Sequence, residues 1–232
     1  MVPMHSPDEL ERLRLDDSDG FDIALRRRTT DASGEVYELV VNGMFAMDSV
    51  DASSEIALAD LVDDDARRVL VGGLGLGFTA GALLDRLPEV HVDVAELSSG
   101  LIQWAGEDLV PSLTRVHDDP RCMLVHTDVA DLLLRASRLT TEQKYDAILL
   151  DVDNGPDFLI HDHNAALYGE DLLSAGFNSL TPGGLLAIWC EGETPALAEA
   201  LADLGPLTSL VTVPVSRDGH QILYAIHCVR RP

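Results

Sequence analysis

The amino-acid sequence predicts an α/β fold, in which a doubly wound, seven-stranded sheet with a C-terminal antiparallel hairpin follows a small N-terminal β-unit. From residue 68, apolar strand-like segments alternate with helical segments, which is typical of a parallel sheet covered on both faces. The preceding residues instead alternate apolar and polar side chains, as half-buried strands do. Two strand-like segments joined by a polar turn end the sequence, and they favour the terminal hairpin.

The N-terminal β-unit and a connecting helix are predicted over residues 1–65. Residues 21–28 and 35–43 alternate like half-buried strands, and the second segment ends in an Asn-Gly pair that favours a tight hairpin turn. Residues 51–62 combine an Asp/Ser start with apolar side chains at helical spacing. This pattern predicts a helix that leads into the larger sheet.

In the larger unit, residues 66–232, strands and helices alternate along the chain. We expect strands over 68–73, 90–96, 121–128, 145–151 and 185–190. We expect helices over 77–87, 98–110, 129–137, 169–180 and 194–204. The terminal hairpin is expected to pair residues 207–215 with residues 220–229. Because crossovers between parallel strands are right-handed, the carboxyl ends of these strands share one edge of the sheet, where ligands bind.

A glycine-rich loop joins the first strand of this unit to its helix. Gly73, Gly75 and Gly77 occur within a few residues of one another, directly after Gly72. Glycine lets a backbone turn tightly and approach a ligand closely, so this segment is a candidate nucleoside-binding loop. A tight strand-to-helix turn without a ligand is the alternative interpretation.

Acidic side chains follow the next two strands. Glu96 ends its strand about twenty residues after the glycines, where a carboxylate can accept hydrogen bonds from a ribose diol. Asp128 follows the third strand, where a carboxylate can accept from an adenine amino group. Both residues also have a simpler interpretation as helix caps. The pattern indicates a nucleoside without saying which one, since enzymes that bind NAD use the same ribose contact.

Carboxylates gather where the fourth strand ends. The apolar residues 147–150 lead into a segment that contains Asp151, Asp153, Asn154 and Asp157. At the edge predicted to bind the nucleoside, such carboxylates attract a cationic substrate and accept a proton from it. An acidic surface loop is the alternative interpretation.

The order of these motifs resembles that of the spermidine synthase family of aminopropyltransferases, within the class I S-adenosylmethionine-dependent transferases. The resemblance rests on the segments ELVVNGMFAMDSVDASSEIALADL, VLVGGLGLGFTAGALL, VAELSSGLIQWA, YDAILLDVDNGPD and LYGEDLLSAGFNSLTPGGLLAIWCEG. It implies a Rossmann-like catalytic domain over residues 66–232 that binds S-adenosylmethionine or its decarboxylated form as a co-substrate. The residues that would bind this co-substrate are Gly73, Gly75, Gly77, Glu96 and Asp128. The resemblance also implies catalytic positions at Asp151, which would orient an attacking amine and accept its proton, and at Asn154.

The sequence departs from that family on the side of the acceptor. Leu76 stands at the position of an Asp that holds the substrate's ammonium group, and Asn154 at that of the second signature Asp. Ala46 stands at the position of a Gln in the hairpin that contacts the nucleoside substrate. We therefore expect a retained nucleoside-binding half, together with an altered half for the aminopropyl group and the polyamine.

Three functions remain open on this scaffold. The first is alkyl transfer from a sulfonium nucleoside to an amine or another small-molecule acceptor. The second is methyl transfer from S-adenosylmethionine, which Leu76 favours, and the third is a non-catalytic module that binds a nucleoside or a partner. An oxidoreductase that binds NAD is disfavoured by the terminal hairpin and by the loop after Asp151. The resemblance also allows a homodimer.

Composition and charge restrict the partners and the location. With a net charge of −24, the surface repels nucleic acid and anionic lipid, so we expect neither as a partner. No apolar run is long enough to span a bilayer, and the first residues lack the pattern of a signal peptide, so we expect a cytoplasmic protein. Cys122, Cys190 and Cys228 lie in apolar contexts that predict buried thiols. His161 and His163 have no clear third ligand, so we expect no metal site.

Overall fold

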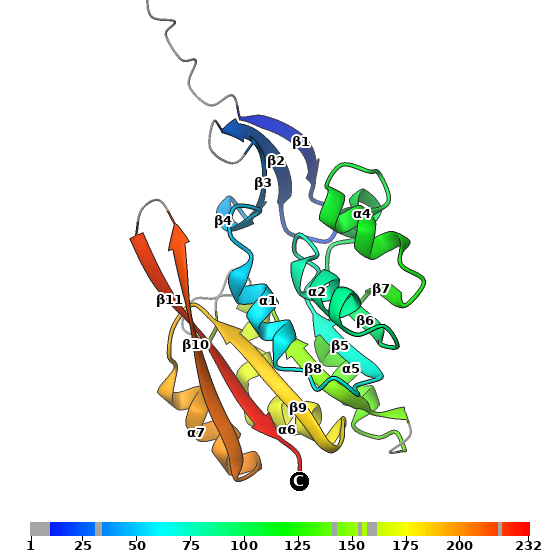
Figure 1. Ribbon diagram of the computed structural model, residues 1–232, viewed down its shortest axis with the longest axis vertical. Coiled ribbons are helices and arrows are strands. Elements are labelled where there is room, and N and C mark those ends of the chain that lie inside the picture. The colour runs from blue at the N-terminus through cyan, green and yellow to red at the C-terminus, as the bar shows by residue number, and fades with distance from the viewer. Residues whose placement is uncertain (1–9, 31–33, 141–142, 153–154, 157–161, 218–219) are drawn as a thin grey trace, which may run out of the picture.

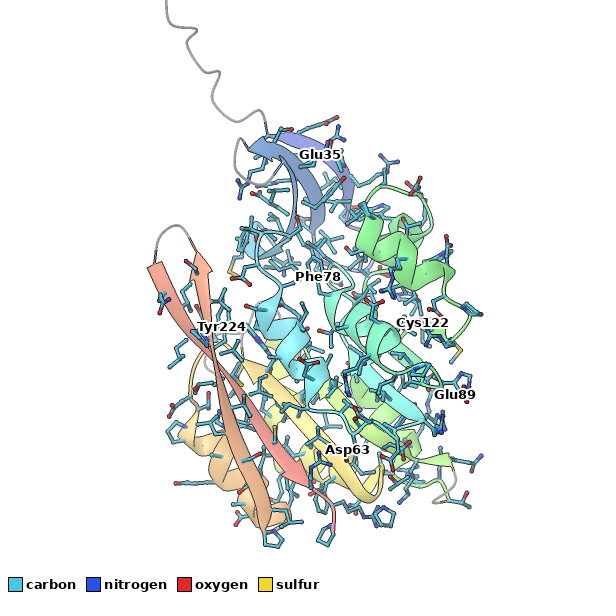
Figure 2. All side chains as sticks on the ribbon, viewed as in Figure 1. Glu35, Asp63, Phe78, Glu89, Cys122 and Tyr224 are labelled. Carbon is cyan, nitrogen blue, oxygen red and sulfur yellow. The ribbon has the colours of Figure 1, made fainter. Side chains whose placement is uncertain are left out.

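The structure of the protein is a computed structural model that describes residues 10–30, 34–140, 143–152, 155–156, 162–217 and 220–232. A small antiparallel sheet lies at one end of a larger mixed sheet, and helices cover both faces of the larger sheet (Figure 1). Acidic side chains such as Glu35, Asp63 and Glu89 are exposed on both units, in keeping with the net charge (Figure 2).

Four antiparallel strands form the small sheet in chain order. They are β1 Glu11–Asp16, β2 Ile23–Thr30, β3 Gly34–Val41 and β4 Met44–Asp48. Asn42 and Gly43 turn the chain from β3 into β4 with φ angles of 51° and 76°, the left-handed backbone that an Asn-Gly hairpin requires. The sequence did not predict β1, because most of its side chains are exposed and so give no pattern of buried residues. An ion pair from Arg27 to Glu11 supports the register of β1 on β2.

Seven strands form the large sheet in the order β10-β11-β9-β8-β5-β6-β7. They are β5 Arg68–Gly72, β6 His91–Glu96, β7 Cys122–His126, β8 Tyr145–Leu150, β9 Leu180–Cys190, β10 Leu207–Arg217 and β11 His220–Arg230. Strands β5 to β9 pair in parallel, while β11 is antiparallel to both of its neighbours. This topology confirms the predicted α/β fold with its seven-stranded sheet and C-terminal antiparallel hairpin.

Most helices and strands lie close to their predicted bounds, but one helix and one strand differ from them clearly. The helices are α1 Ser53–Asp60, α2 Phe78–Arg86, α3 Ser99–Ala105, α4 Pro111–Asp118, α5 Val129–Ala136, the short 3-10 helix η2 Asp162–Tyr168, α6 Glu170–Asn178 and α7 Pro195–Leu204. The predicted helix over 98–110 ends at Ala105, and Pro111 starts the separate helix α4 in a first-turn position that suits proline. Strand β9 begins at Leu180 rather than at residue 185, because Leu180 already pairs with Tyr145 of β8 and the residues before Leu185 form an irregularity in this pairing.

Two hydrophobic cores, one on each face of the large sheet, hold the layers together. Neighbouring residues of β5 alternate between them: Val69 and Val71 belong to one core, and Leu70 belongs to the other. The first core also contains apolar side chains of β2, β3, α1 and α2, so the small sheet packs on the same face as these helices. The predicted domain boundary near residue 65 stays a prediction.

The order in which strands are added to the large sheet reverses at β5, whose neighbours are β6 and β8. The loops that leave the carboxyl ends of β5 and β8 therefore run to opposite sides of the sheet and leave a crevice between them. Gly73 follows β5 and Asp151 follows β8, so both predicted site residues lie at this crevice.

Membrane-spanning helices, cysteines and metal-binding clusters can be described only for the residues that the structure describes. No helix there is long and apolar enough to cross a membrane. Cys190 and Cys228 are buried, Cys122 is half-buried, and none of the three is part of a disulfide. No cluster of His, Cys, Asp and Glu side chains in these residues is arranged to hold a metal ion, and His161 lies outside them.

Candidate functional site

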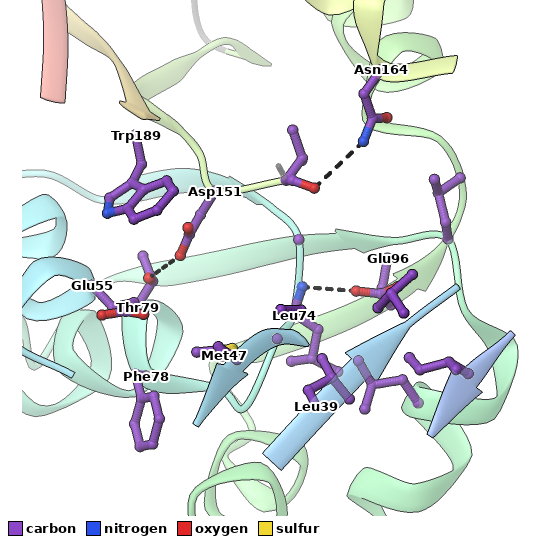
Figure 3. Close-up of a pocket in the computed structure, with 18 of the residues that line it drawn as sticks. Leu39, Met47, Glu55, Leu74, Phe78, Thr79, Glu96, Asp151, Asn164 and Trp189 are labelled. Carbon is purple, nitrogen blue, oxygen red and sulfur yellow. Dashed lines mark hydrogen bonds between the residues drawn. The ribbon is translucent and has the colours of Figure 1, made fainter. Parts of the chain in front are cut away.

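A pocket of about 260 Å³ lies at the crevice between β5 and β8, and the small sheet forms one of its walls. The other walls include the glycine loop, the first turns of α1 and α2, and the carboxyl ends of β6, β8 and β9. Four of the predicted site residues line it: Gly73, Gly75, Glu96 and Asp151. Figure 3 shows Glu96 and Asp151 at two places around the same pocket, so the ends of β6 and β8 meet there.

The glycine loop runs close to the chain that follows β8. Gly73 has a φ of +91°, and a Cβ atom at this residue would overlap the carbonyl oxygen of Asp151. Both sides are tied to strands, because Gly73 N–H donates to Ala95 O at 2.8 Å and Asp151 N–H donates to Gly72 O at 2.9 Å. The close approach of the two loops therefore requires glycine at residue 73.

Backbone amides hold Glu96 at the end of β6. Leu74 N–H donates to Glu96 Oε2 at 2.9 Å, and Ser98 N–H donates to Oε1 at 2.7 Å. Burial raises the pKa of Glu96, while hydrogen bonds from the amides of Ser98, Leu74 and Leu97 oppose this rise. Each carboxylate oxygen can accept more than one hydrogen bond, so Glu96 is also able to receive the two hydroxyls of a ribose. The N-cap of α3 is Ser98 rather than Glu96.

Asp151 lies directly after β8, beside the first turn of α2. Thr79 Oγ1 donates a hydrogen bond to Asp151 Oδ2 at 2.8 Å (Figure 3). The pKa of Asp151 is raised to about 7, mainly by burial and also by the nearby Glu55 carboxylate, while the hydrogen bond from Thr79 lowers it. A carboxyl group with this pKa takes up a proton near neutral pH, as a general base must.

The remaining predicted site residues are not gathered in the pocket. Gly77 is the N-cap of α2 and is not among the lining residues. Asp128 is the N-cap of α5, where its Oδ1 accepts from Ala130 N–H at 2.8 Å, and it does not line the pocket either. Its contact with adenine stays a prediction. Asn154 lies outside the described residues.

None of the aromatic side chains that line the pocket was predicted, and two of them contact each other. The ring centroids of Trp189, at the end of β9, and Tyr224, on β11, lie 4.7 Å apart. Figure 3 shows Trp189 next to Asp151. The rule that ligands lie at strand ends would have found Trp189 and the lining residue Glu191, because both lie where β9 ends. Tyr224 enters from a hairpin strand that runs in the opposite direction, and no local pattern marks it.

The ionisable side chains that line the pocket are acidic. The carboxylates that line it belong to Glu55, Glu96, Asp151 and Glu191. In the part of the chain that the structure describes, no lysine or arginine lines the pocket. These surroundings favour a cationic ligand and disfavour one that carries a free carboxylate.

Together, the fold and the pocket define a protein with the fold of class I S-adenosylmethionine-dependent methyltransferases. The chain belongs to the methyltransferase small domain family, whose model matches residues 37–206. A search of curated proteins finds no match.

Two solved structures are similar in fold. A crystal structure of spermidine synthase in complex with the transition state analogue AdoDATO has a TM-score of 0.75 and 17% sequence identity, and the alignment covers 96% of this chain and 74% of that one. The crystal structure of spermidine synthase from Thermotoga maritima has a TM-score of 0.71 and 17% identity, with 96% and 73% of the two chains covered. These matches confirm the resemblance to spermidine synthases at the level of the fold.

Proposed function

We propose that the protein is a transferase that moves an alkyl group from a sulfonium nucleoside to a small amine. The donor would lack a free carboxylate, as decarboxylated S-adenosylmethionine does. The observation that carries this proposal is the acidic pocket, whose lining contains four carboxylates and, within the described residues, no lysine or arginine. A sulfonium and an amine are both cations near neutral pH, and nearby carboxylates reduce the repulsion between them by up to a few kcal/mol at ~4 Å.

The position of Asp151 supports a role as the proton acceptor. A protonated amine must lose a proton before its nitrogen attacks, and a carboxyl group with a pKa of about 7 takes it near neutral pH. The nitrogen lone pair then forms the new C–N bond while the C–S bond breaks, and the nucleoside leaves as a neutral thioether. The fold shared with a spermidine synthase crystallised with AdoDATO supports a nucleoside in the same crevice.

Methyl transfer from S-adenosylmethionine is the second candidate function, and the family match favours it. The side chain of Leu76 is fully buried and does not line the pocket, so this position offers no acidic contact to the ammonium group of either donor. If methyl transfer is the reaction, backbone amides rather than a cationic side chain would have to bind the donor's carboxylate.

Calorimetric titration with four ligands separates these functions. The ligands are S-adenosylmethionine, its decarboxylated form, methylthioadenosine and NAD. We expect the decarboxylated donor to bind at least about 10-fold more tightly than S-adenosylmethionine, because the pocket repels a carboxylate. Tighter binding of S-adenosylmethionine would support methyl transfer instead. Binding of NAD alone would indicate an oxidoreductase, and no binding of any of the four would leave a module that binds a partner.

The ribose contact is tested by replacing Glu96 with Gln. The side-chain amide of Gln must turn its NH₂ group toward Leu74 N–H or Ser98 N–H, so one of the two hydrogen bonds that hold residue 96 is lost. We expect the dissociation constant of methylthioadenosine to rise by about 10- to 100-fold, the range for a lost hydrogen bond to a charged group. The matched control is Glu89→Gln, at an exposed residue outside the pocket, which should bind as the wild type does. Equal affinities of the two variants would exclude the contact.

A further inference from the structure

The small sheet contacts the glycine loop through the side chain of Met47, on β4. Leu76 N–H, in the loop, donates to Met47 Sδ at 3.2 Å. A Cβ atom on Gly75 would lie 2.7 Å from the same sulfur, so the absence of a side chain at residue 75 lets the thioether approach the loop. Met47 also lines the pocket, and Figure 3 shows it on β4 facing the loop beside Leu74. The sulfur therefore joins the small sheet to the nucleoside-binding loop.

An irregularity in β4 places this sulfur. The register of β4 on β3 shifts between the pairs Leu39–Met47 and Val40–Phe45, which leaves Ala46 as an extra residue. In a regular strand, neighbouring side chains point to opposite faces. Here Phe45, Ala46 and Met47 all line the pocket, as expected where a bulge turns the side chains of a strand next to a site.

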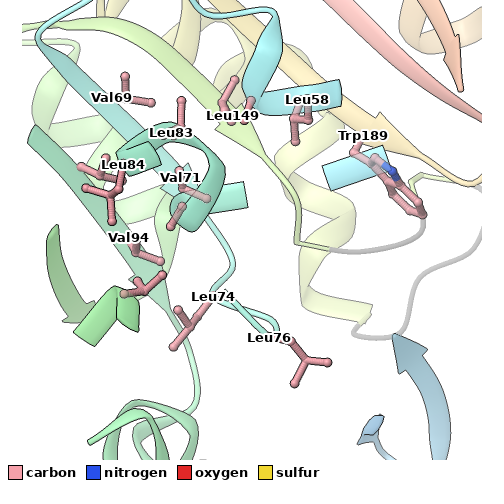
Figure 4. Packing of buried hydrophobic residues seen from close by; sticks show 14 of the residues in the cluster. Leu58, Val69, Val71, Leu74, Leu76, Leu83, Leu84, Val94, Leu149 and Trp189 are labelled. Carbon is pink, nitrogen blue, oxygen red and sulfur yellow. The ribbon is translucent and has the colours of Figure 1, made fainter. Parts of the chain in front are cut away.

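Neighbouring amides of the loop are bound by groups of the large unit. Leu74 N–H donates to Glu96, and Gly77 N–H donates to Leu74 O at 2.9 Å. Leu76 N–H lies between them and is bound by the small sheet instead. Because the side chain of Leu76 is fully buried in the hydrophobic core (Figure 4), core packing on one side and the thioether on the other both hold this residue.

We propose that Met47 is a positioning residue of the nucleoside site, which keeps the glycine loop in its binding conformation by accepting the Leu76 amide. A thioether is a weak acceptor on a flexible side chain, so the contact adjusts the loop rather than folding it. In this proposal the small sheet contributes to nucleoside binding, because it holds the glycine loop through Met47. The effect on ligand binding rests on the proposed function, whereas the contact between sulfur and amide does not.

The test compares Met47→Leu, which removes the acceptor at similar volume, with Met44→Leu on the same strand. Met44 is exposed and does not line the pocket. In Met47→Leu we expect hydrogen exchange of the Leu76 amide, followed by NMR, to become about 3- to 10-fold faster, while the Leu74 and Gly77 amides keep their wild-type rates. The dissociation constant of methylthioadenosine should rise by a similar factor, about 3- to 10-fold. Met44→Leu should match the wild type in both measurements.

The outcomes separate this proposal from the proposed function. Faster exchange at Leu76 together with weaker binding of methylthioadenosine supports the positioning role. Unchanged exchange at Leu76 overturns it whatever the affinity does, because the thioether then does not hold the loop. Faster exchange with unchanged affinity overturns it as well, since the loop then needs no help from the small sheet. If the wild type binds no nucleoside, the proposed function fails, and the exchange rate at Leu76 still decides whether Met47 holds the loop. A volume-conserving swap of this kind usually leaves the fold intact.

Discussion

Replacing Asp151 with Asn is expected to lower turnover by about 100-fold or more, with little change in affinity for methylthioadenosine. Asn has nearly the same shape and still accepts the hydrogen bond from Thr79, but it cannot take up the proton of an amine. The nucleoside contacts expected at Gly73 and Glu96 remain. The expected loss of turnover is measured with decarboxylated S-adenosylmethionine and an amine as substrates. The expected unchanged affinity is measured by calorimetry with methylthioadenosine. Asp203→Asn, at an exposed residue of α7, is the matched control.

The dependence of turnover on pH gives a second measure of the same role. Because the pKa of Asp151 is about 7, wild-type turnover is expected to rise as the pH passes through about 7 and Asp151 loses its proton. The hydrogen bond from Thr79 lowers this pKa, so Thr79→Val should move the midpoint to higher pH. A midpoint that stays in place in Thr79→Val, or full turnover in Asp151→Asn, would remove Asp151 from the reaction.

The same carboxyl group affects stability in a defined direction. The folded state keeps the Asp151 proton up to about pH 7, whereas the unfolded chain releases it near the ordinary pKa of 3.8. The folded state therefore binds more protons between these values, and this group lowers the free energy of unfolding as pH rises from about 4 to about 7. Asp151→Asn should consequently be more stable than the wild type at about pH 8 and similarly stable at about pH 4. Urea titrations at the two pH values measure this, and an equal gain at both would contradict it.

The parts of the site that were predicted from the sequence lie on the ends of parallel strands. Gly73 and Asp151 follow β5 and β8, Glu96 ends β6, and right-handed crossovers alone bring these three strand ends to one edge of the sheet. The prediction therefore needed only the strands themselves, which uninterrupted apolar segments mark clearly. Asp128 shows the limit of the rule, because a residue at a strand end is also well placed to cap the next helix.

The parts that were not predicted depend on packing between segments that are far apart in the sequence. Met47 reaches the glycine loop because β4 bulges and because the small sheet packs against the core of the large one. Tyr224 reaches the pocket because β11 returns antiparallel next to β9, where its ring meets Trp189. The sequence predicted the hairpin of β10 and β11, but neither the pairing of β11 with β9 nor the bulge in β4 has a local pattern that predicts it.

Replacing Gly73 with Ala is expected to destabilise the fold by at least about 3 kcal/mol and to abolish measurable binding of methylthioadenosine. Two effects add up at this residue. Its φ of +91° is unfavourable for any side chain, and its Cβ atom would overlap the Asp151 carbonyl oxygen. That oxygen is part of the backbone and cannot rotate away as a side chain can. The N–H groups of Gly73 and Asp151 are hydrogen-bonded to Ala95 O and Gly72 O, so neither the glycine loop nor the chain after β8 moves away easily. Urea denaturation and calorimetry measure the two expected losses.

Gly183→Ala separates the two effects, because Gly183 has a similar φ of +84° but no atom within 4 Å of its added Cβ. Its N–H still donates to Arg231 O after the change, so only the backbone conformation is penalised, by about 1–2 kcal/mol. The additional loss in Gly73→Ala then measures the overlap with the loop after β8. Equal losses in the two variants would show that the loops separate freely, and the shape of the crevice would then not depend on glycine at residue 73. A larger loss in Gly73→Ala, together with lost nucleoside binding, would mean that the close approach of the two strand-end loops forms the site.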